Sequence, residues 1–268
     1  MILATVLAAQ VAIAGSSVVD LPRAGNGVDY QLYVHVPPAC EAEDVRCPVV
    51  YTLDADYSFA LAAQIIGHLA DRGQLQPLVT VAVGYADKSR YRQNRTRDYT
   101  PSFVASGGYG AEVQELSGGG PEFLRVLRDE IIPFVEARYA VRTGDRTLVG
   151  HSYGGLFAAW TTTAAPGLFG NYIMVSPSLW YDNGAQLAAM QRRRGAPGAR
   201  LRVYIGVGEH EEQPQNGRAM VTGARAAAAA MRSWGEGVEV FDEVLAGETH
   251  ASVFPAALSN GLRRLFGR

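Results

Sequence analysis

The sequence predicts an α/β protein with a central, mostly parallel β-sheet and helices on both faces, and three observations support this. Short continuous apolar runs recur along the 268 residues, which is the pattern of strands buried on both faces. Segments with helical spacing lie between these runs, and alternating strands and helices favour a parallel sheet. A segment near the N-terminus alternates apolar and polar residues instead, which predicts an antiparallel strand or hairpin there.

The alternating segment covers residues 28–36 (VDYQLYVHV), and two prolines end it. The clearest helix is predicted over 121–139, where Pro121 suits a first helical turn and large apolar side chains share one stripe. The predicted buried strands are 49–53, 78–84, 147–151, 172–176, 201–207 and 238–244.

The stretch 86–120 breaks this rhythm. It is rich in Arg, Gly, Ser and Tyr and shows no clear period, which predicts a long loop. Loops longer than about 15 residues within a compact domain are often binding loops or lids. We therefore expect residues 16–268 to form one domain, in which 86–120 is a candidate lid or substrate loop.

Charge and composition narrow the range of partners. The chain has 24 basic and 26 acidic residues, so its net charge is −2, and it has no long run of like charges. We therefore expect no binding to nucleic acid or to an anionic membrane, and a small-molecule partner fits better. Hydrophobic residues make up 48% of the chain and charged residues 19%, which is typical of a packed globular protein.

The first 15 residues (MILATVLAAQVAIAG) form an apolar run that ends in the small-x-small pattern of Ala12, Ile13 and Ala14. This predicts a signal peptide, and hence a periplasmic or secreted protein. The run has no Lys or Arg near Met1, so the alternatives are a mis-assigned start codon or a cytoplasmic protein with a buried N-terminal segment. It is too short to span a bilayer.

The two cysteines, Cys40 and Cys47, flank an acidic loop beside the predicted N-terminal strand. Export would favour a small disulfide between them, and the alternative is two unpaired thiols on a surface loop. With only two cysteines we expect no metal site built on them.

The strongest local signal is the run GHSYGG at 150–155, which lies directly after a buried strand and before a helical segment. This is the G-x-S-x-G nucleophile elbow of α/β-hydrolases in its required context. The abrupt turn from strand to helix strains Ser152 and points its hydroxyl outward, and we expect Gly150 and Gly154 to let neighbouring backbone pass. The alternative is a glycine-rich turn with an incidental serine.

A nucleophilic serine needs a base within hydrogen-bond reach, and in this fold the chain order is serine, acid, histidine. His250 follows the last predicted strand, in the loop GETHAS before a final helix, where that order requires the base. The remaining histidines fit this order poorly; they are His35, His68, His151 and His210.

Three glutamates are candidates for the acid that orients the base. Glu209, Glu211 and Glu212 follow the strand at 201–207, at the sheet edge where α/β proteins gather their functional groups. Spacing from Gly208 favours Glu211. Asp182, after the preceding strand, is a weaker candidate, and a serine–histidine pair without a strong acid partner is the remaining alternative.

Two backbone amides are predicted to bind the oxyanion of a tetrahedral intermediate. The N–H of Tyr153 lies next to the nucleophile at a helix N-terminus. The second donor should come from the loop after the first central strand, where we choose the N–H of Asp56. The side chains of Asp54 and Asp56 are also suited to capping the next helix, and the two roles are compatible.

Several motifs together resemble one family. They are LDAD after the first central strand, RTRDYTP at 95–101, GHSYGG, SPSLWYD at 176–182, VGEHEE and GETHASVFP. In this order they look like the esterases related to esterase D and to periplasmic siderophore esterases of the enterobactin-hydrolysing type. The likeness covers roughly residues 28–268. Many relatives carry glycine where Ala55 stands, and some siderophore esterases work with a serine–histidine pair alone.

Carried over residue by residue, the resemblance implies Ser152 as nucleophile, His250 as base and Glu211 as acid, with the amides of Asp56 and Tyr153 as the oxyanion hole. It also implies that Arg95, Arg97 and Asp98 lie near the mouth of the site, where guanidinium groups would hold an anionic or catecholate substrate. Trp180 and Tyr181 would line the acyl or alcohol pocket. The alternatives are solvated arginines and a tryptophan that only covers core.

These observations predict a serine esterase that works through an acyl-enzyme on Ser152 and needs no metal or organic cofactor. Its substrate would be a small-molecule ester, with a siderophore-type ester as one candidate. Two other classes remain: an acyltransferase that passes the acyl group to an alcohol, and an inactive binding module. The sequence does not specify the ester or the oligomeric state.

Overall fold

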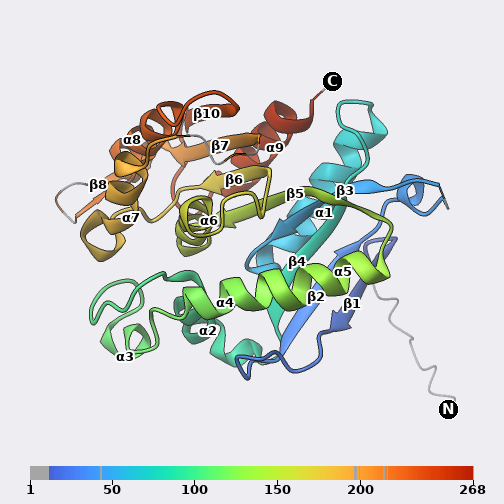
Figure 1. Cartoon of the computed structure of the whole chain (residues 1–268), viewed down its shortest axis with the longest axis horizontal. Coiled ribbons are helices and arrows are strands. Elements are labelled where there is room, and N and C mark those ends of the chain that lie inside the picture. The colour runs from blue at the N-terminus through green and yellow to red at the C-terminus, as the bar shows by residue number, and fades with distance from the viewer. Residues whose placement is uncertain are drawn as a thin grey trace, which may run out of the picture.

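The computed structural model describes residues 12–42, 44–195, 198, 200–213, 215 and 217–267 (Figure 1). The predicted leader falls largely on residues 1–11, which lie outside the described part of the chain. Within the described ranges, no helix combines the length and apolar character needed to cross a membrane.

A single eight-stranded sheet forms the centre of the protein, with strand order β1-β2-β4-β3-β5-β6-β7-β10. The first two strands are antiparallel to their neighbours, and every pair from β4 to β10 is parallel. This confirms the predicted mostly parallel sheet with an N-terminal antiparallel pair. The strands are β1 (Ser16–Asp20), β2 (Tyr30–His35), β3 (Cys47–Thr52), β4 (Val79–Tyr85), β5 (Val141–His151), β6 (Asn171–Val175), β7 (Leu201–Gly208) and β10 (Val238–Leu245).

Helices cover both faces of the sheet (Figure 1). One face carries α1 (Ala55–Asp71) and α9 (Val253–Phe266), and the other carries α6 (Tyr153–Ala164) and α8 (Met220–Arg232), with α7 (Tyr181–Arg192) against both of the latter. The predicted helix over 121–139 is one continuous rod on the second face. It consists of α4 (Gly120–Val126), a π-helical turn (Leu127–Ile131) and α5 (Ile132–Arg138).

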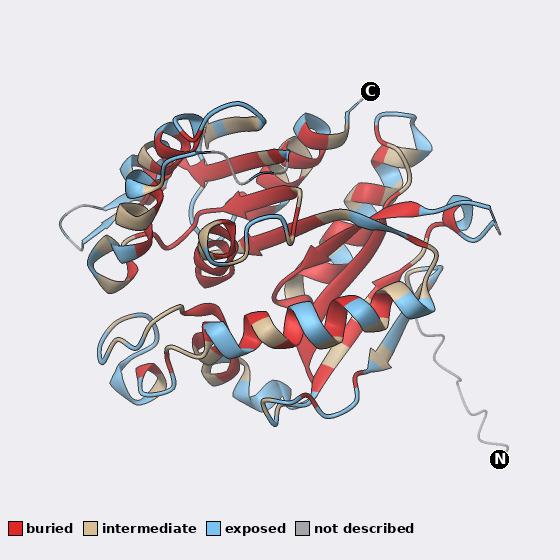
Figure 2. Cartoon of the chain, viewed as in Figure 1, coloured by how far each residue is buried: buried red, intermediate tan, exposed pale blue. Residues whose placement is uncertain are grey.

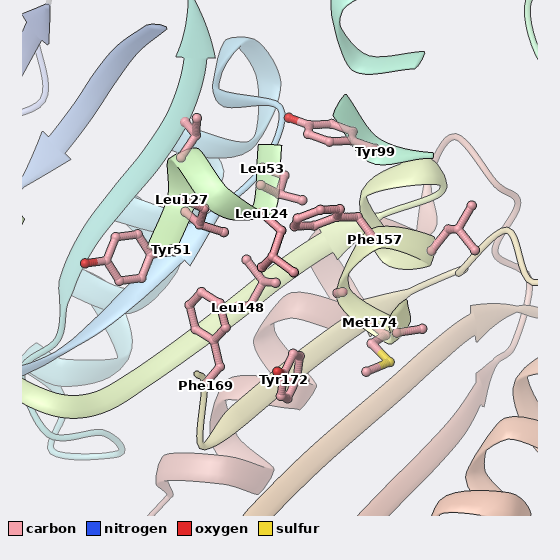
Figure 3. Packing of buried hydrophobic residues seen from close by; sticks show 14 of the residues in the cluster. Tyr51, Leu53, Tyr99, Leu124, Leu127, Leu148, Phe157, Phe169, Tyr172 and Met174 are labelled. Carbon is pink, nitrogen blue, oxygen red and sulfur yellow. The ribbon is translucent and has the colours of Figure 1, made fainter. Parts of the chain in front are cut away.

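The core fills both layers between sheet and helices, and the central strands are buried along most of their length (Figure 2). On the second face Tyr51 and Leu148 of the sheet belong to one cluster with Leu124 and Leu127 of the long rod and Phe157 of α6 (Figure 3). Continuous apolar runs therefore mark strands covered on both sides, as predicted, except at 238–244, where β10 is an edge strand and its residues are mostly half-buried.

The segment predicted as a long loop, 86–120, is partly helical. It contains a 3₁₀ turn (Lys88–Arg90), α2 (Tyr91–Tyr99) and the short α3 (Ala111–Gln114). The loop prediction was wrong for α2 because the buried positions of this helix include Asn94, Arg95 and Asp98, so no apolar stripe marks it. Polar contacts take the place of apolar packing there.

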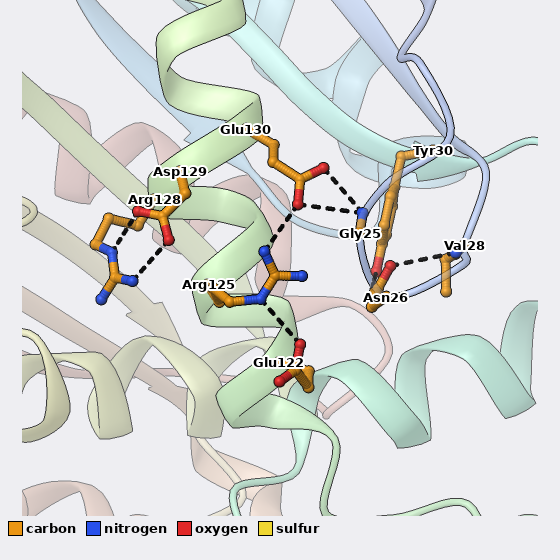
Figure 4. Close-up of polar contacts among 9 residues, drawn as sticks. All are labelled: Gly25, Asn26, Val28, Tyr30, Glu122, Arg125, Arg128, Asp129 and Glu130. Carbon is orange, nitrogen blue, oxygen red and sulfur yellow. Dashed lines mark hydrogen bonds and ion pairs between the residues drawn. The ribbon is translucent and has the colours of Figure 1, made fainter.

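A disulfide and a long-range hydrogen bond fasten the N-terminal region to this frame. Cys40, which ends a 3₁₀ turn (Pro38–Cys40), forms a disulfide with Cys47 at the start of β3. On the second face, the Glu130 carboxylate accepts the N–H of Gly25 at 3.1 Å and pairs with Arg125 (Figure 4). The Glu130 contact holds the loop before β2 against the long helical rod, and the disulfide closes the connection between β2 and β3.

Candidate active site

Ser152 sits in the sharp turn between β5 and α6. Its backbone has φ 60° and ψ −116°, a left-handed conformation that is strained for a serine. The Ser152 N–H donates to the carbonyl of Val175 at 3.0 Å, and its own carbonyl accepts from the N–H of Ser178 at 3.1 Å. The turn is therefore fixed by the neighbouring strand β6 and the residues that follow it.

Glycine is required at two positions around this turn, and only one of them matches the prediction. A methyl group on Gly150 would lie 2.1 Å from the carbonyl oxygen of Gly154, so Gly150 permits the close approach. A methyl group on Gly154 would make only ordinary contacts of 3.5 Å, contrary to our expectation. On Gly155 it would lie 2.9 Å from Pro177 Cα, so the second tight position is Gly155.

His250 lies in the loop between β10 and α9, and its imidazole meets the carboxylate of Glu211. The distance from Nδ1 of His250 to Oε2 of Glu211 is 2.5 Å. Glu211 is 4% exposed, whereas the His250 side chain is about half exposed. A buried carboxylate on one ring nitrogen fixes the orientation of the imidazole and leaves the other nitrogen to face the pocket.

The other acid candidates are used elsewhere. Glu209 accepts the N–H of Gly247 at 2.9 Å, and Glu212 accepts the N–H groups of Val221 and Thr222 at the start of α8. Asp182 accepts the hydroxyl of Ser102 at 2.6 Å. Of the four candidates, Glu211 is the one that contacts His250.

Ser152 and His250 line the same pocket, which has a volume of about 510 Å³. The hydroxyl of Ser152 lies 3.4 Å from that of Ser178, and within the described residues it makes no hydrogen bond to His250. Hydrogen bonds between catalytic groups are often long before substrate binds. The wall also includes Arg95, Tyr109, Tyr153, Ser178, Trp180, His210, Glu211, Arg218 and Met220.

His151 lies beneath this pocket and packs against the ring of His250, with 4.6 Å between the ring centroids. Its Nδ1 is 3.1 Å from the hydroxyl of Tyr57. Burial, together with the charges of His250 and Arg95, lowers the pKa of His151 to about 3. At neutral pH the neighbour of His250 is therefore an uncharged aromatic ring.

Arg95 reaches the pocket from α2, where its charge is balanced by Asp54. Nε of Arg95 donates to Oδ1 of Asp54 at 2.9 Å and Nη2 to Oδ2 at 3.1 Å, and both side chains are almost fully buried. Burial opposes the charge on Arg95, but the Asp54 carboxylate outweighs it and raises the pKa of Arg95 well above its usual value. The guanidinium stays charged beside Ser152.

The contacts of Arg95 extend to both sides of the pocket. Nη1 donates to the hydroxyl of Tyr109 at 2.8 Å, and Nη2 lies 3.5 Å from the carbonyl oxygen of His151. A guanidinium has five N–H donors, so counting the described residues one donor on Nη1 is left for a ligand. Asp54 itself has φ 59°, a strained conformation that aims its carboxylate at Arg95.

Of the three other residues predicted to bind substrate, one lines the pocket and two do not. Trp180 lines the pocket, but Tyr181 does not: it is buried and donates to the carbonyl of Ser102. Arg97 is also placed elsewhere, which corrects our expectation, because its guanidinium bonds Asp98 and Asn94.

Of the two residues predicted to donate to the oxyanion, one lies in the pocket wall and the other does not. Tyr153 is a wall residue at the first position of α6. Asp56 is absent from the described pocket wall, and its carboxylate pairs with Lys88 at 3.2 Å. The wall therefore includes Tyr153 and Arg95, together with Ser152, and not Asp56.

Sequence analysis missed Ser176, Ser178, Tyr109 and Arg218. The first two belong to the motif SPSLWYD and follow β6 directly, so their position at a strand end was an available signal. Tyr109 comes from an irregular segment and Arg218 from the two-residue strand β9 (Arg218–Ala219), and neither segment carries such a signal. Among the residues that the structure describes, no group of three or more His, Cys, Asp or Glu is arranged to hold a metal ion.

Comparison with known proteins finds relatives that are named as esterases. A family model described as "Putative esterase" matches residues 25–265. The siderophore enterobactin esterase of Emericella nidulans is 30% identical over 253 residues, covering 83% of each chain. The ferri-bacillibactin esterase BesA of Bacillus subtilis is 26% identical over 267 residues, covering 94% of this chain and 89% of that protein.

Solved structures share the whole fold. The crystal structure of BES protein from Bacillus cereus superposes with a TM-score of 0.81 at 27% identity, covering 97% of this chain and 98% of that one. The siderophore hydrolase EstB from Aspergillus nidulans, at 23% identity, shares the fold with a TM-score of 0.80 over the same shares of the two chains. The α/β-hydrolase architecture expected from the nucleophile elbow is thereby confirmed.

Proposed function

This chain belongs to the esterase family and is a carboxylic ester hydrolase related to siderophore esterases; on that premise we propose that it cleaves esters through an acyl-enzyme on Ser152. One observation carries the proposal. Ser152, which has a strained backbone at the end of β5, lines the same pocket as His250. The Nδ1 of His250 contacts the buried carboxylate of Glu211.

In the proposed first step, rotation of the Ser152 side chain exchanges its contact with Ser178 for one with Nε2 of His250. His250 takes the hydroxyl proton as the serine oxygen attacks the ester carbonyl. Glu211 stabilises the imidazolium that forms. His250 then gives the proton to the departing alcohol, and in the second half of the cycle it activates the water that releases the acid.

The developing oxyanion has two candidate donors near Ser152. The first amides of a helix have no intrahelical partner, so the N–H of Tyr153 is available. The remaining N–H of Arg95 supplies a charged donor, which we prefer to the amide of Asp56 because Arg95 lines the pocket. A fixed guanidinium in a partly dry site stabilises negative charge strongly.

We further propose a siderophore-type ester as the substrate, since similar proteins carry the names siderophore enterobactin esterase and ferri-bacillibactin esterase. The wall supports an aromatic, electron-rich ligand because Tyr109, Tyr153 and Trp180 lie beside the guanidinium groups of Arg95 and Arg218. Export is part of the proposal too, because a disulfide between Cys40 and Cys47 suits an oxidising compartment.

The test is rapid-mixing kinetics with p-nitrophenyl esters of rising chain length, beside hydrolysis of a ferric catecholate ester. Where hydrolysis of the acyl-enzyme is much slower than its formation, the reaction should begin with a burst of p-nitrophenol equal to the enzyme concentration. The Arg95→Lys variant should lose about 100-fold in kcat, since one charged donor is displaced. Absence of hydrolysis, or transfer of the acyl group only to an added alcohol, would contradict the proposal.

A further inference from the structure

Three residues directly after β6 contact Glu211, the start of α6 and Ser152. Ser176, Pro177 and Ser178 follow one another directly, and each contacts a different functional element. Ser176 bonds Glu211, Pro177 packs on Gly155 at the start of α6, and Ser178 lies beside Ser152. No described contact joins Ser152 to Glu211. The tripeptide contacts both residues or their neighbours, and so connects the two.

Ser176 is held in an unusual conformation for its residue type. It is fully buried and has φ 43°, a left-handed value that favours glycine. Its N–H donates to the carbonyl of Gly206 at 2.7 Å, and its hydroxyl donates to Oε1 of Glu211 at 2.6 Å. Glycine would be less strained here, but it could not make the buried hydrogen bond that the Ser176 hydroxyl makes to Glu211.

The Glu211 carboxylate is thereby clamped by three partners. Oε1 accepts both the Ser176 hydroxyl and the N–H of Gly208, the latter at 2.7 Å, and Oε2 faces His250. A methyl group on Gly208 would come within 2.9 Å of Oε1, so the carboxylate is closely confined. With Oε1 saturated, Oε2 is the oxygen left to orient the histidine.

We propose that Ser176 is a positioning residue of the reaction, which acts through Glu211 to set the orientation of His250, while the rest of the tripeptide ties that orientation to the Ser152 turn. This inference rests on the proposed function. It assigns a catalytic purpose to a buried hydroxyl that does not line the pocket, and it explains the strain at Ser176.

The closing experiment is a double-mutant cycle between Ser176→Gly and Glu211→Gln, with kcat and KM measured on one p-nitrophenyl ester. Ser176→Gly should lower kcat by about 10-fold to 100-fold with KM little changed, because a short bond to a carboxylate is lost. In the Glu211→Gln background the same substitution should change kcat by less than about twofold.

Two controls separate positioning from folding. Ser176→Ala removes the hydroxyl but keeps the strain, so it should match Ser176→Gly in kcat while unfolding at a lower temperature. Asn183→Gly relieves a similar φ of 52° at an exposed position away from the pocket, and should leave kcat within about twofold. If Ser176→Gly and Ser176→Ala both lost stability but kept the wild-type kcat, the inference would be overturned.

The outcomes also separate this inference from the proposed function. If the wild-type protein hydrolyses no ester, the proposed function fails. If it hydrolyses the ester but the Ser176 and Glu211 effects are additive, only the positioning role of Ser176 is overturned. A Ser176→Gly variant with full kcat would have the same consequence.

Discussion

The pocket is built from two regions that differ in how their residues are held. At the carboxyl ends of β5, β6 and β7, which we call the catalytic edge, Ser152 and Glu211 are placed by strands with continuous apolar cores. A second part of the wall, which we call the α2 wall, is where α2 brings Arg95 to the pocket through contacts with Asp54 and Tyr109.

The difference shows what each region depends on. The catalytic edge is positioned by hydrophobic burial of the sheet, so its polar residues need only local hydrogen bonds to be aimed. The α2 wall has buried polar residues at its centre, and there the ion pair between Arg95 and Asp54 is itself part of the packing. Loss of one polar group should therefore damage activity alone at the edge, and both activity and stability at the wall.

The largest effect on activity is expected at the catalytic edge. His250→Ala should lower kcat by about four orders of magnitude, because the base is removed, with little change in the free energy of unfolding. Activity on a p-nitrophenyl ester and urea denaturation measure the two quantities. His68→Ala, on the exposed side of α1, is the matched control. A His250→Ala variant with near wild-type kcat would show that His250 is not the general base.

The α2 wall should respond in both quantities. Asp54→Asn leaves Arg95 buried without a countercharge, so the free energy of unfolding should fall by about 3–5 kcal/mol and kcat by about 100-fold. Asp29→Asn is the control, since its pair with Arg23 is exposed and should contribute at most about 1 kcal/mol. Equal losses in the free energy of unfolding of Asp54→Asn and Asp29→Asn would contradict the expected difference between the buried and the exposed ion pair.

The disulfide lies at the other end of the sheet, at the start of β3, and should affect stability only. Replacing Cys40 and Cys47 by serine opens a loop with a sequence separation of 7, which should cost about 2–3 kcal/mol by loop entropy. kcat should be unchanged. A substantial loss of kcat would indicate that the pocket depends on this distant link.

The last effect is a pH dependence of stability at His151, which appears only in acid solution. Because its pKa is about 3 in the folded protein and near 6.5 when unfolded, the unfolded chain binds the extra proton between these values. This contribution to stability is complete above pH 6.5 and is lost as the pH falls toward 3, at up to about 1.4 kcal/mol per pH unit. His151→Gln should show a shallower loss over that window. Parallel pH profiles for variant and wild type would contradict it.

Sequence reasoning recovered the catalytic edge because its signals are local. The apolar run before Ser152 and the glycines around it define a strand and a turn, and the chain order then points to His250. The choice of Glu211 used its spacing from Gly208, and the structure shows why that spacing matters: the Gly208 N–H donates to the same carboxylate.

The α2 wall could not be recovered in the same way. The buried side chains of α2 are Asn94, Arg95, Thr96, Asp98 and Tyr99, and this mostly polar set leaves no period for an apolar pattern to reveal. The side on which an arginine lies depends on where that helix packs, so the sequence could not separate Arg95, which reaches the pocket, from Arg97, which binds Asp98. Such placement is set by tertiary contacts.

The most direct test of the central claim, that Ser152 is the nucleophile activated by His250, is labelling with a fluorophosphonate followed by peptide mass spectrometry. The account predicts one adduct on the peptide carrying Ser152, no adduct in Ser152→Ala, and much slower labelling in His250→Ala. An adduct on another residue, or no reaction in a folded wild-type protein, would contradict it.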